Sequence, residues 1–344
     1  MSGLRKSDTQ APEMSAFGRK EGVPGEFEVI ERLFAPLAGP EGLALKDDAA
    51  LFRPSPDTEL VLTKDAIAEG RHYLAGDPPE DVARKLLRVN LSDLAAKGAC
   101  ARGYLLACAW SNALSFAWME RFAEGLARDQ EKYGVRLYGG DTIVTEGPSV
   151  FSLTGVGEVA AGAMVKRAGA QPGDGIYVTG TIGDAALGLG AARGELDLLS
   201  QSERDALIGR YRLPDPPVAF GERLAEVAHA AIDVSDGLIA DLHHLCDASG
   251  LGGVLERDHV PLSRETRTAL DKGLPVWQGV LGGGDDYQIL FAASSAKKES
   301  IEALSTECGT RITRIGRFEP GSGVTVVDAR GAPVDVGPEG FSHF

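Results

Sequence analysis

Apolar residues recur along the chain with two spacings, which predict a mixture of helices and strands. Intervals of three and four residues run from about 80 to 97 and from 116 to 133, as in helices that bury one face. The apolar run at 61–65 predicts a buried strand whose end turns polar, and runs at 135–138 and 150–159 also have strand length. Two glycines are expected to break the last of these strands. The pattern predicts a mixed α/β protein with mixed sheets.

The segment Ile232 to Leu238 changes from a strand pattern to a helical pattern. Asp233, Ser235 and Asp236 stand at the change. Their oxygens are hard ligands that suit Mg²⁺, and the first N–H groups of a helix can face an anion. Ordinary helix capping is the alternative interpretation. A calcium loop is excluded, because Leu238 and His244 stand where an EF-hand needs Gly and Glu.

The first long helix carries a polar stripe opposite its leucines. Its predicted start is a capping pattern, with Asp77 as N-cap and Pro78 as the first helical residue. Further along, Asn90, Asp93 and Lys97 are three and four residues apart and point the same way. The stripe is either a solvated Asp93–Lys97 pair or part of a ligand site.

Other short polar clusters stand at the ends of predicted strands. Glycines before an acid let the backbone approach a ligand while the carboxylate binds its metal. A charged or glycine-rich turn is the alternative for each cluster taken alone. The clusters are Lys46-Asp47-Asp48, Thr63-Lys64-Asp65, Glu69-Gly70-Arg71-His72, Gly139-Gly140-Asp141-Thr142 and Gly284-Asp285-Asp286.

A length of 344 residues predicts roughly two domains. Residues 1–24 lack periodicity, and we expect a disordered tail. Small residues near 160 mark the boundary between an N-terminal domain, 25–160, and a C-terminal domain, 161–344. Arg167 lies just beyond this boundary, where its guanidinium could clamp a phosphate.

The charge balance restricts the partners. Lys and Arg total 35 against 50 Asp and Glu, a net charge of −15, which argues against nucleic acid and anionic membranes as partners. Four cysteines without C-x-x-C pairing indicate reduced thiols and a cytoplasmic location. No apolar run approaches the roughly 18 residues of a membrane span, so we expect a soluble, unexported protein.

Together, acids distributed over both halves favour phosphoryl transfer with nucleotide held through several Mg²⁺ ions, since neither a Walker A pattern nor protein-kinase motifs occur. The ordered set resembles thiamine-monophosphate kinase, of the aminoimidazole ribonucleotide synthetase-like superfamily, from about residue 25 to 344. Phe344 stands where the hydrogenase maturation relatives carry a cysteine. The motifs are Lys46-Asp47-Asp48-Ala49-Ala50, Asn90-Leu91-Ser92-Asp93-Leu94-Ala95-Ala96, Gly139-Gly140-Asp141-Thr142, Asp233-Val234-Ser235-Asp236-Gly237-Leu238 and Gly284-Asp285-Asp286-Tyr287.

The resemblance implies a role for each matched residue. Catalysis would depend on Asp93, Asp141 and Asp236. ATP contacts are implied for Gly140, Asp141, Arg167 and Ser235, and thiamine phosphate contacts for His72, Asp285 and Phe341. Mg²⁺ ligation is implied for Asp48, Thr63, Lys64 or its backbone, Asp65, Asp93, Asp141, Asp233 and Asp236. Three positions depart from the family pattern: Lys46 replaces Gly, Lys64 replaces a small hydroxyl residue, and Asp285 replaces Glu.

The implied reaction is in-line attack by thiamine phosphate on the γ-phosphorus of ATP, the final step of thiamine diphosphate biosynthesis. The implied architecture is two α/β domains in a homodimer paired through the N-terminal sheets, with nucleotide near that interface. The alternatives are a superfamily synthetase with another substrate and a non-catalytic nucleotide- or Mg²⁺-binding module.

Overall fold

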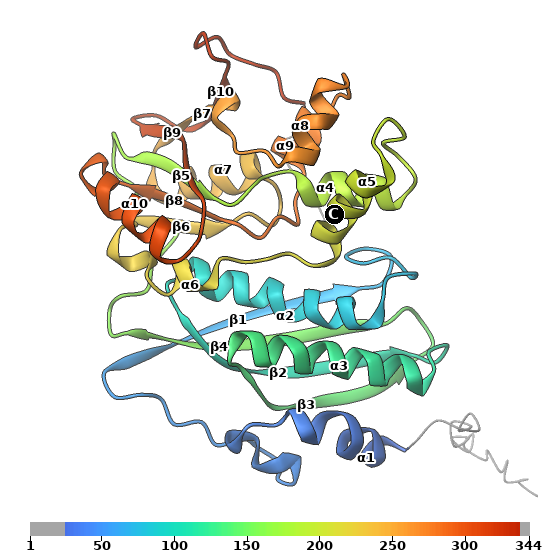
Figure 1. Ribbon diagram of the computed structural model, residues 1–344. Helices are drawn as coiled ribbons and strands as arrows, with labels where there is room; N and C mark the ends of the chain where they lie inside the picture. The colour runs from blue at the N-terminus through green and yellow to red at the C-terminus, as the bar shows by residue number, and fades with distance from the viewer. Residues whose placement is uncertain (1–24, 338–344) are drawn as a thin grey trace, which may run out of the picture.

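The computed structural model describes residues 25–337, which form two β-sheets with a long helix between them (Figure 1). In the first sheet the strand order is β1-β4-β2-β3, with β2 and β3 parallel and the other pairs antiparallel. Helices α2 (Pro79–Ala96) and α3 (Phe116–Tyr133) cover one face, and short helical segments from α1 (Glu26–Val29) to Leu45 precede the sheet. The strands are β1 (Thr58–Ala68), β2 (Cys100–Ser111), β3 (Arg136–Thr145) and β4 (Val150–Ala160).

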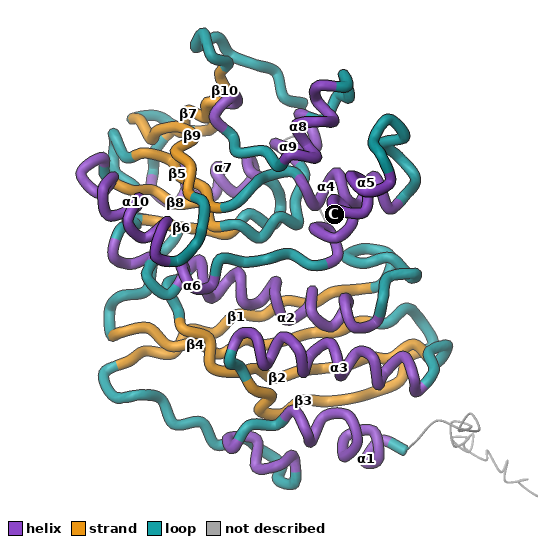
Figure 2. Tube along the Cα trace, in the orientation of Figure 1, coloured by secondary structure: helices purple, strands orange, loops and turns teal. Residues whose placement is uncertain are grey.

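The second sheet has the strand order β10-β7-β9-β5-β8-β6 and is antiparallel except for the pair β10 and β7 (Figure 2). Its strands are β5 (Gly175–Thr179), β6 (Ala230–Asp233), β7 (Gly252–Glu256), β8 (Ile289–Ala293), β9 (Ile312–Glu319) and β10 (Gly323–Val327). The helices of this half are α4 (Asp184–Ala192), α5 (Gln201–Arg212), α6 (Val218–Gly221), α7 (Leu238–Ser249), α8 (Arg264–Asp271), α9 (Trp277–Gly282) and α10 (Lys298–Glu307). The mixed α/β class expected from the apolar pattern is confirmed.

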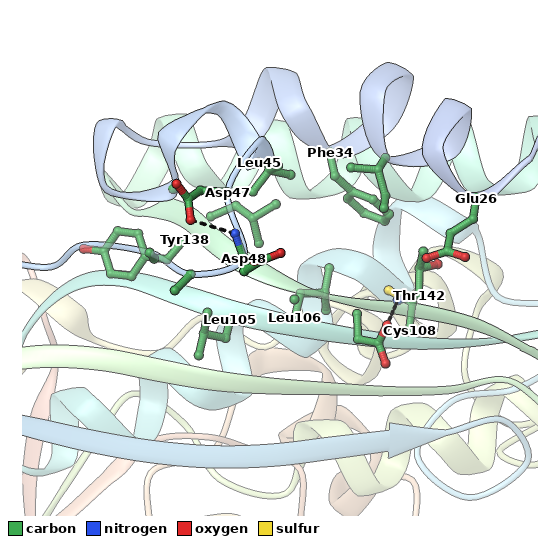
Figure 3. Close-up of a pocket in the computed structure, with 18 residues that line it drawn as sticks. Glu26, Phe34, Leu45, Asp47, Asp48, Leu105, Leu106, Cys108, Tyr138 and Thr142 are labelled. Atoms are coloured by element: carbon green, nitrogen blue, oxygen red, sulfur yellow. Dashed lines mark hydrogen bonds between the residues drawn. The ribbon is translucent and has the colours of Figure 1, made fainter.

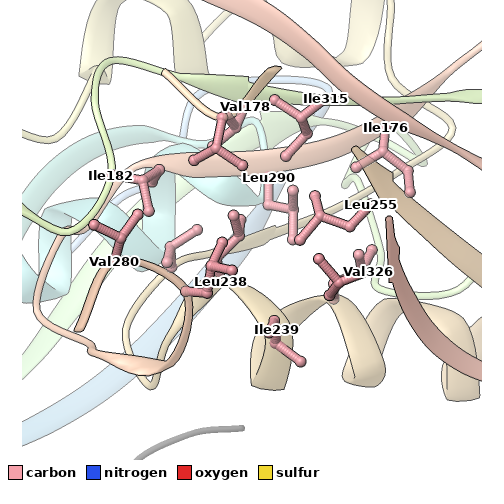
Figure 4. Packing of buried hydrophobic residues seen from close by; sticks show 14 of the residues in the cluster. Ile176, Val178, Ile182, Leu238, Ile239, Leu255, Val280, Leu290, Ile315 and Val326 are labelled. Carbon is pink, nitrogen blue, oxygen red and sulfur yellow. The ribbon is translucent and has the colours of Figure 1, made fainter. Parts of the chain in front are cut away.

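Each half has its own apolar core. In the N-terminal half, the Trp110 ring packs on Phe122 and Phe151, with ring centroids 5.3 and 5.0 Å away. In the C-terminal half, Leu238 of α7 and Leu290 of β8 lie in one fully buried cluster (Figure 4). Such close packing makes each sheet a rigid support for the loops at its edge.

Helix α2 connects the two cores. Its Leu87 and Leu91 pack in the core of the first sheet, while Ala95 and Ala96 pack against Phe291 of the second half. Because α2 is buried on nearly every side, its polar residues must find partners inside the protein. These partners lie at the junction between the halves, where the polar clusters of the sequence meet.

The face of the first sheet opposite α2 and α3 is open; we call it the outer face. Along β1, Val61 on the helix side is 5% exposed, whereas Leu60 and Leu62 on the outer face are 46% and 65% exposed. Leu105 and Ile143 extend the exposed apolar surface across β2 and β3. The prediction of a buried strand at 61–65 is therefore wrong for one of its two faces.

Glycines in this sheet do not interrupt it. Residues 139–142, expected at the end of a strand with a turn as the alternative, lie inside β3, and β4 runs through Gly155 and Gly157 without a break. Gly140 permits a close approach: a Cβ there would lie 1.8 Å from the Leu106 carbonyl oxygen on β2. The glycines therefore allow neighbouring strands and α2 to come close instead of ending the strands.

The predicted cap of α2 is also wrong. The helix starts at Pro79 with Pro78 as N-cap and no side-chain capping bond. Asp77 instead accepts hydrogen bonds from the Leu74 amide at 2.8 Å and from Arg212 Nε at 2.6 Å, which joins this turn to α5. No helix within residues 25–337 is long and apolar enough to cross a membrane.

Candidate active site

Strand β1 and helix α2 bring two of the predicted metal ligands together on the helix side of the first sheet. The Thr63 hydroxyl donates a short hydrogen bond to Asp93. One turn before Asp93, the Asn90 side-chain oxygen accepts the backbone N–H of Asp65 at 3.1 Å. The polar stripe of α2 therefore faces β1 and not solvent.

The loop between β6 and α7 adds acids from the C-terminal half. Asp233 ends β6, is 5% exposed and accepts a hydrogen bond from the Ser92 hydroxyl of α2 at 2.8 Å. Asp236, three residues on, lies close enough to Asp65 to raise its pKa. Acids from both halves of the chain thus meet at one place, as the divided set of motifs predicts.

Burial raises the pKa values of these carboxylates, and neighbouring acids add to the shift for Asp65 and Asp233. Burial raises the pKa of Asp65 to about 6, with smaller contributions from the negative charges of Asp93 and Asp236. Burial also raises the pKa of Asp93, and it holds the pKa of Asp233 well above its usual range, with Asp93 as the next cause. Buried carboxylates that lie this close together favour the binding of a cation.

A further acid, Asp241 in the first turn of α7, shapes the loop. Its Oδ2 accepts the backbone N–H groups of Ser235, Asp236 and Gly237 at 3.0, 3.1 and 3.2 Å. Burial and the nearby Asp236 raise the pKa of Asp241 to about 7. The capping alternative for Ser235 and Asp236 is wrong, because the N-cap of α7 is Gly237 and no side chain makes a capping bond.

Positive charge faces the same cluster. A cavity of about 390 Å³ is lined by apolar residues and by Thr63, Asp93, Lys97, Lys166 and Arg167. Lys97 Nζ donates to the Ala231 carbonyl at 2.7 Å, and burial lowers the Lys97 pKa to about 8. Among the described residues Lys97 and Asp93 form no ion pair within 4 Å, so the solvated-pair interpretation is wrong.

Two of the residues matched to substrate binding, His72 and Asp285, meet through a buried lysine. Lys85 Nζ donates to the His72 carbonyl at 2.9 Å and to Asp285 Oδ2 at 2.8 Å. The His72 ring accepts the Ala68 amide at Nδ1, 3.0 Å away, so the neutral ring carries its proton on Nε2. Phe341, the third residue of the set, lies outside the described residues.

The loop that carries Asp285 is attached to the acidic loop before α7. The backbone N–H groups of Asp285 and Tyr287 donate to the carbonyls of Ser235 at 2.9 Å and Val234 at 2.8 Å. A Cβ at Gly284 would lie 2.0 Å from the Ser235 oxygen, so only glycine fits this contact. The two loops form one unit at the edge of the second sheet.

Three of the predicted metal- and ATP-binding residues lie apart from the carboxylate cluster of Asp65, Asp93 and Asp233. Asp48, Gly140 and Asp141 line a second cavity of about 310 Å³ between the N-terminal segments and β3 (Figure 3). Its apolar wall includes Phe34, Leu45 and Leu106 (Figure 3). The cavity combines carboxylates with an apolar surface large enough for a flat ring.

Strand register separates Asp141 from Asp65 within one chain. Ala66 pairs with Ser152 of β4, Ser152 with Ala107 of β2, and Ala107 with Asp141 of β3, so Asp141 and Ala66 point to the same outer face. Asp65, next to Ala66 in β1, points to the opposite, helix side. The strands of Asp65 and Asp141 are three interstrand spacings apart, about 14 Å at about 4.8 Å each. Lys64 also lies on the outer face, where its Nζ donates to Ser152 Oγ at 2.8 Å. An ammonium cannot ligate a metal, which leaves only the Lys64 backbone oxygen for that role.

Three residues with clear contacts in the site were missed from the sequence: Lys85, Ser92 and Asp241. Lys85 and Ser92 are seven residues apart on α2, so both lie near the face that meets the second half. An acid in the first turn of a helix is a recognisable signal for Asp241. Nothing in the local pattern marks the first two, because their partners are 200 and 141 residues away.

The comparisons with known proteins agree with the motif set. Residues 46–159 match the model of the AIR synthase related protein N-terminal domain, and residues 171–329 match that of its C-terminal domain. The thiamine-monophosphate kinase of Caulobacter vibrioides is 42% identical over 307 residues, covering 88% of this chain and 86% of that protein.

Solved structures agree as well. The crystal structure of thiamine-monophosphate kinase from Stenotrophomonas maltophilia K279a has a TM-score of 0.76 and 38% identity, covering 82% of this chain and 89% of that one. AaThiL complexed with AMPPCP and TMP has a TM-score of 0.75 and 30% identity, covering 96% of this chain and all of that one (100%). The chain therefore belongs to the thiamine-monophosphate kinase family within the AIR synthase-related proteins.

Proposed function

We propose that the protein transfers the γ-phosphate of ATP directly and in line to the phosphate of thiamine monophosphate, giving thiamine diphosphate. The observation that carries this proposal is the junction where Asp65 and Asp93 of one half meet Asp233 and Asp236 of the other. The AaThiL complex with AMPPCP, an ATP analogue, and TMP supports both substrates. Family membership does not favour a synthetase with another substrate or a non-catalytic module.

The acceptor needs little activation. A phosphate monoester has a second pKa of about 6, so its oxygens are already ionised near neutral pH. The work left to the protein is to hold two polyanions in line and to offset their repulsion. Arg167 and Lys97 beside Asp93 supply fixed positive charge for this purpose. We assign ATP contacts to Gly140, Asp141, Arg167 and Ser235.

Mg²⁺ fits the carboxylate cluster as the metal. Asp65, Asp93 and Asp233 are hard oxygen donors whose pKa values are raised mainly by burial, with nearby carboxylates adding to the shift for Asp65 and Asp233. Thr63 and Asp236 complete the set on this side of the sheet, and Asp48 and Asp141 form the set of the second cavity. When bound, Mg²⁺ screens the phosphates and stabilises the charge that develops during transfer.

We also propose a homodimer in which two outer faces pack together. Leu60, Leu62, Leu105 and Ile143 form an exposed apolar surface of the kind that marks an interface. Asp141 lies on that same face, about 14 Å in strand spacing from Asp65 of its own chain. We propose that the cluster of one chain is completed by Asp141 of its partner, so that each site uses two copies.

The thiamine phosphate site in this proposal contains His72, Asp285 and Phe341. The four cysteines are free thiols, which supports a cytoplasmic location.

Direct transfer is tested with ATP made chiral at the γ-phosphorus by oxygen isotopes. A single in-line step inverts the configuration in thiamine diphosphate. Retention would indicate a phosphorylated enzyme intermediate and would refute direct transfer.

Sharing of the site is tested by co-expressing Asp93→Asn and Asp141→Asn chains with different tags. Each variant alone is expected to be inactive. In mixed dimers one site carries both changes and the other carries neither, so random pairing restores about a quarter of the wild-type sites. No restored activity in isolated mixed dimers would place both acids of a site on one chain.

A further inference from the structure

The Lys85 ammonium is buried where three distant segments meet. Lys85 lies on α2 and is 2% exposed. It donates to the His72 carbonyl at 2.9 Å and to Asp285 Oδ2 at 2.8 Å, and it lies 4.1 Å from the centre of the Tyr211 ring of α5. A buried ammonium is costly unless it is paired and hydrogen-bonded, and here it has a carboxylate, a carbonyl and a ring face.

The carboxylate that it binds belongs to a strained loop. Asp285 and Tyr287 have φ angles of +71° and +50°, a conformation that is uncommon for residues other than glycine. The Tyr287 hydroxyl donates to Asp285 Oδ1 at 3.2 Å, while Lys85 binds Oδ2. Both oxygens of Asp285 therefore have a donor, and their direction is set by Lys85 on one side and Tyr287 on the other.

We infer that Lys85 is a positioning residue of the acceptor site and acts through Asp285. The His72 carbonyl and the Tyr211 ring hold the ammonium in place, and the ammonium holds the Asp285 carboxylate. One contact thus joins the His72 turn of the N-terminal half to the 284–287 loop of the C-terminal half. The identity of the acceptor, thiamine monophosphate, rests on the proposed function.

Arg88, three residues further along α2, offers a matched control. It is also buried, at 4% exposure, and pairs with Asp129 at 2.6 Å and with the Pro214 carbonyl at 2.8 Å. Asp129 belongs to α3 of the N-terminal half and not to the 284–287 loop. Removing Lys85 takes away the ion-pair partner of Asp285, and removing Arg88 takes away one of the two arginines that bind the buried Asp129, so both changes should cost stability. Only the loss of Lys85 changes the acceptor site.

The test compares Lys85→Met, Lys85→Arg and Arg88→Met in steady-state assays with each substrate varied in turn. We expect Lys85→Met to raise the KM for thiamine monophosphate about tenfold or more, equivalent to about 1.4 kcal/mol, with the KM for ATP within about twofold. Lys85→Arg keeps the charge and should recover part of the effect. Arg88→Met should leave both KM values near wild type.

A double-mutant cycle with Asp285→Asn decides whether Lys85 acts through Asp285. The double variant Lys85→Met/Asp285→Asn has no unpaired charge at this contact. It can therefore be compared with Asp285→Asn even if Lys85→Met alone does not fold. We expect its KM for thiamine monophosphate to equal that of Asp285→Asn within about twofold. A further tenfold rise in the double variant would overturn the inference, as would equal KM changes in Lys85→Met and Arg88→Met. Inactive wild-type protein would instead refute the proposed function.

Discussion

Removing the charge of Asp65 should make the metal-free protein more stable while it abolishes activity. The Asp65 carboxylate accepts no side-chain or backbone hydrogen bond from the described residues, so Asp65→Asn breaks none. The change removes one of the charges that repel one another around Asp93 and Asp236. A functional carboxylate in this setting costs folding free energy.

The size of the effect follows from the shift in pKa. The pKa of Asp65 rises from 3.8 in the unfolded reference to about 6 in the folded protein. Two units at about 1.4 kcal/mol each give an upper limit of about 3 kcal/mol, and solvent screening of a partly exposed group reduces this to about 1–3 kcal/mol. The folded state disfavours the ionised form, so the cost is fully present above pH 6 and disappears as the pH falls toward 3.8.

The assay is urea unfolding in EDTA at pH 7.5 and pH 5, with wild type, Asp65→Asn and Glu59→Gln as an exposed control on the same strand. We expect Asp65→Asn to gain about 1–3 kcal/mol at pH 7.5 and roughly half of that at pH 5. The control should stay within about 0.5 kcal/mol. Added Mg²⁺ should stabilise wild type more than Asp65→Asn. If Asp65→Asn is no more stable than wild type in EDTA at pH 7.5, the ionised Asp65 carboxylate does not destabilise the folded protein, and the reasoning is refuted.

Two further changes test the loops and the sheet. Asp241→Asn keeps an acceptor for the three loop amides but loses its charge, so kcat should fall. Because burial raises the Asp241 pKa to about 7, the folded state disfavours this charge, and the free energy of unfolding at pH 7.5 should not fall. Unchanged kcat in steady-state assays would mean that Asp241 does not shape the Ser235–Gly237 loop. Gly140→Ala forces a methyl group against the Leu106 carbonyl, so we expect the free energy of unfolding in urea to fall by about 1–3 kcal/mol. ATP binding measured by calorimetry should also be weaker. Normal ATP affinity would mean that the second cavity is not part of the nucleotide site.

Much of the fold was predictable because local patterns and tertiary packing agree. The apolar spacing of 116–133 matches α3, whose Ser115 cap accepts the Trp118 amide and whose Gly134 ends it in the left-handed conformation. The change from strand to helix at Asp233 and Leu238 is likewise where the pattern predicts it. Consistency between propensity and packing explains both results.

The prediction was wrong where strand pairing overrides local propensity. Gly139 and Gly140 were expected where the strand ends, yet they lie inside β3 because that strand pairs with β2 along its length. Gly140 is needed for the close approach to Leu106. This difference matters for the site, since register places the Asp141 side chain on the outer face. A turn would have left its direction open.

Contacts between distant residues could not be predicted from the sequence, for a different reason. Lys85 in an amphipathic helix is ordinarily a solvated residue, and its role depends on Asp285, 200 positions away. The open face of β1 was missed as well, because Leu62 in the run 61–65 resembles a core residue when no partner is considered. The motif set located the acids, and the structure assigns each to one side of the sheet.

The most direct test of the account is to incubate the purified protein with thiamine monophosphate, Mg²⁺ and ATP labelled at the γ-phosphate. The account predicts that label appears in thiamine diphosphate, one molecule for each ADP formed, and that Asp93→Asn forms none. Label released only as inorganic phosphate, or transferred to unphosphorylated thiamine in preference to thiamine monophosphate, would contradict it.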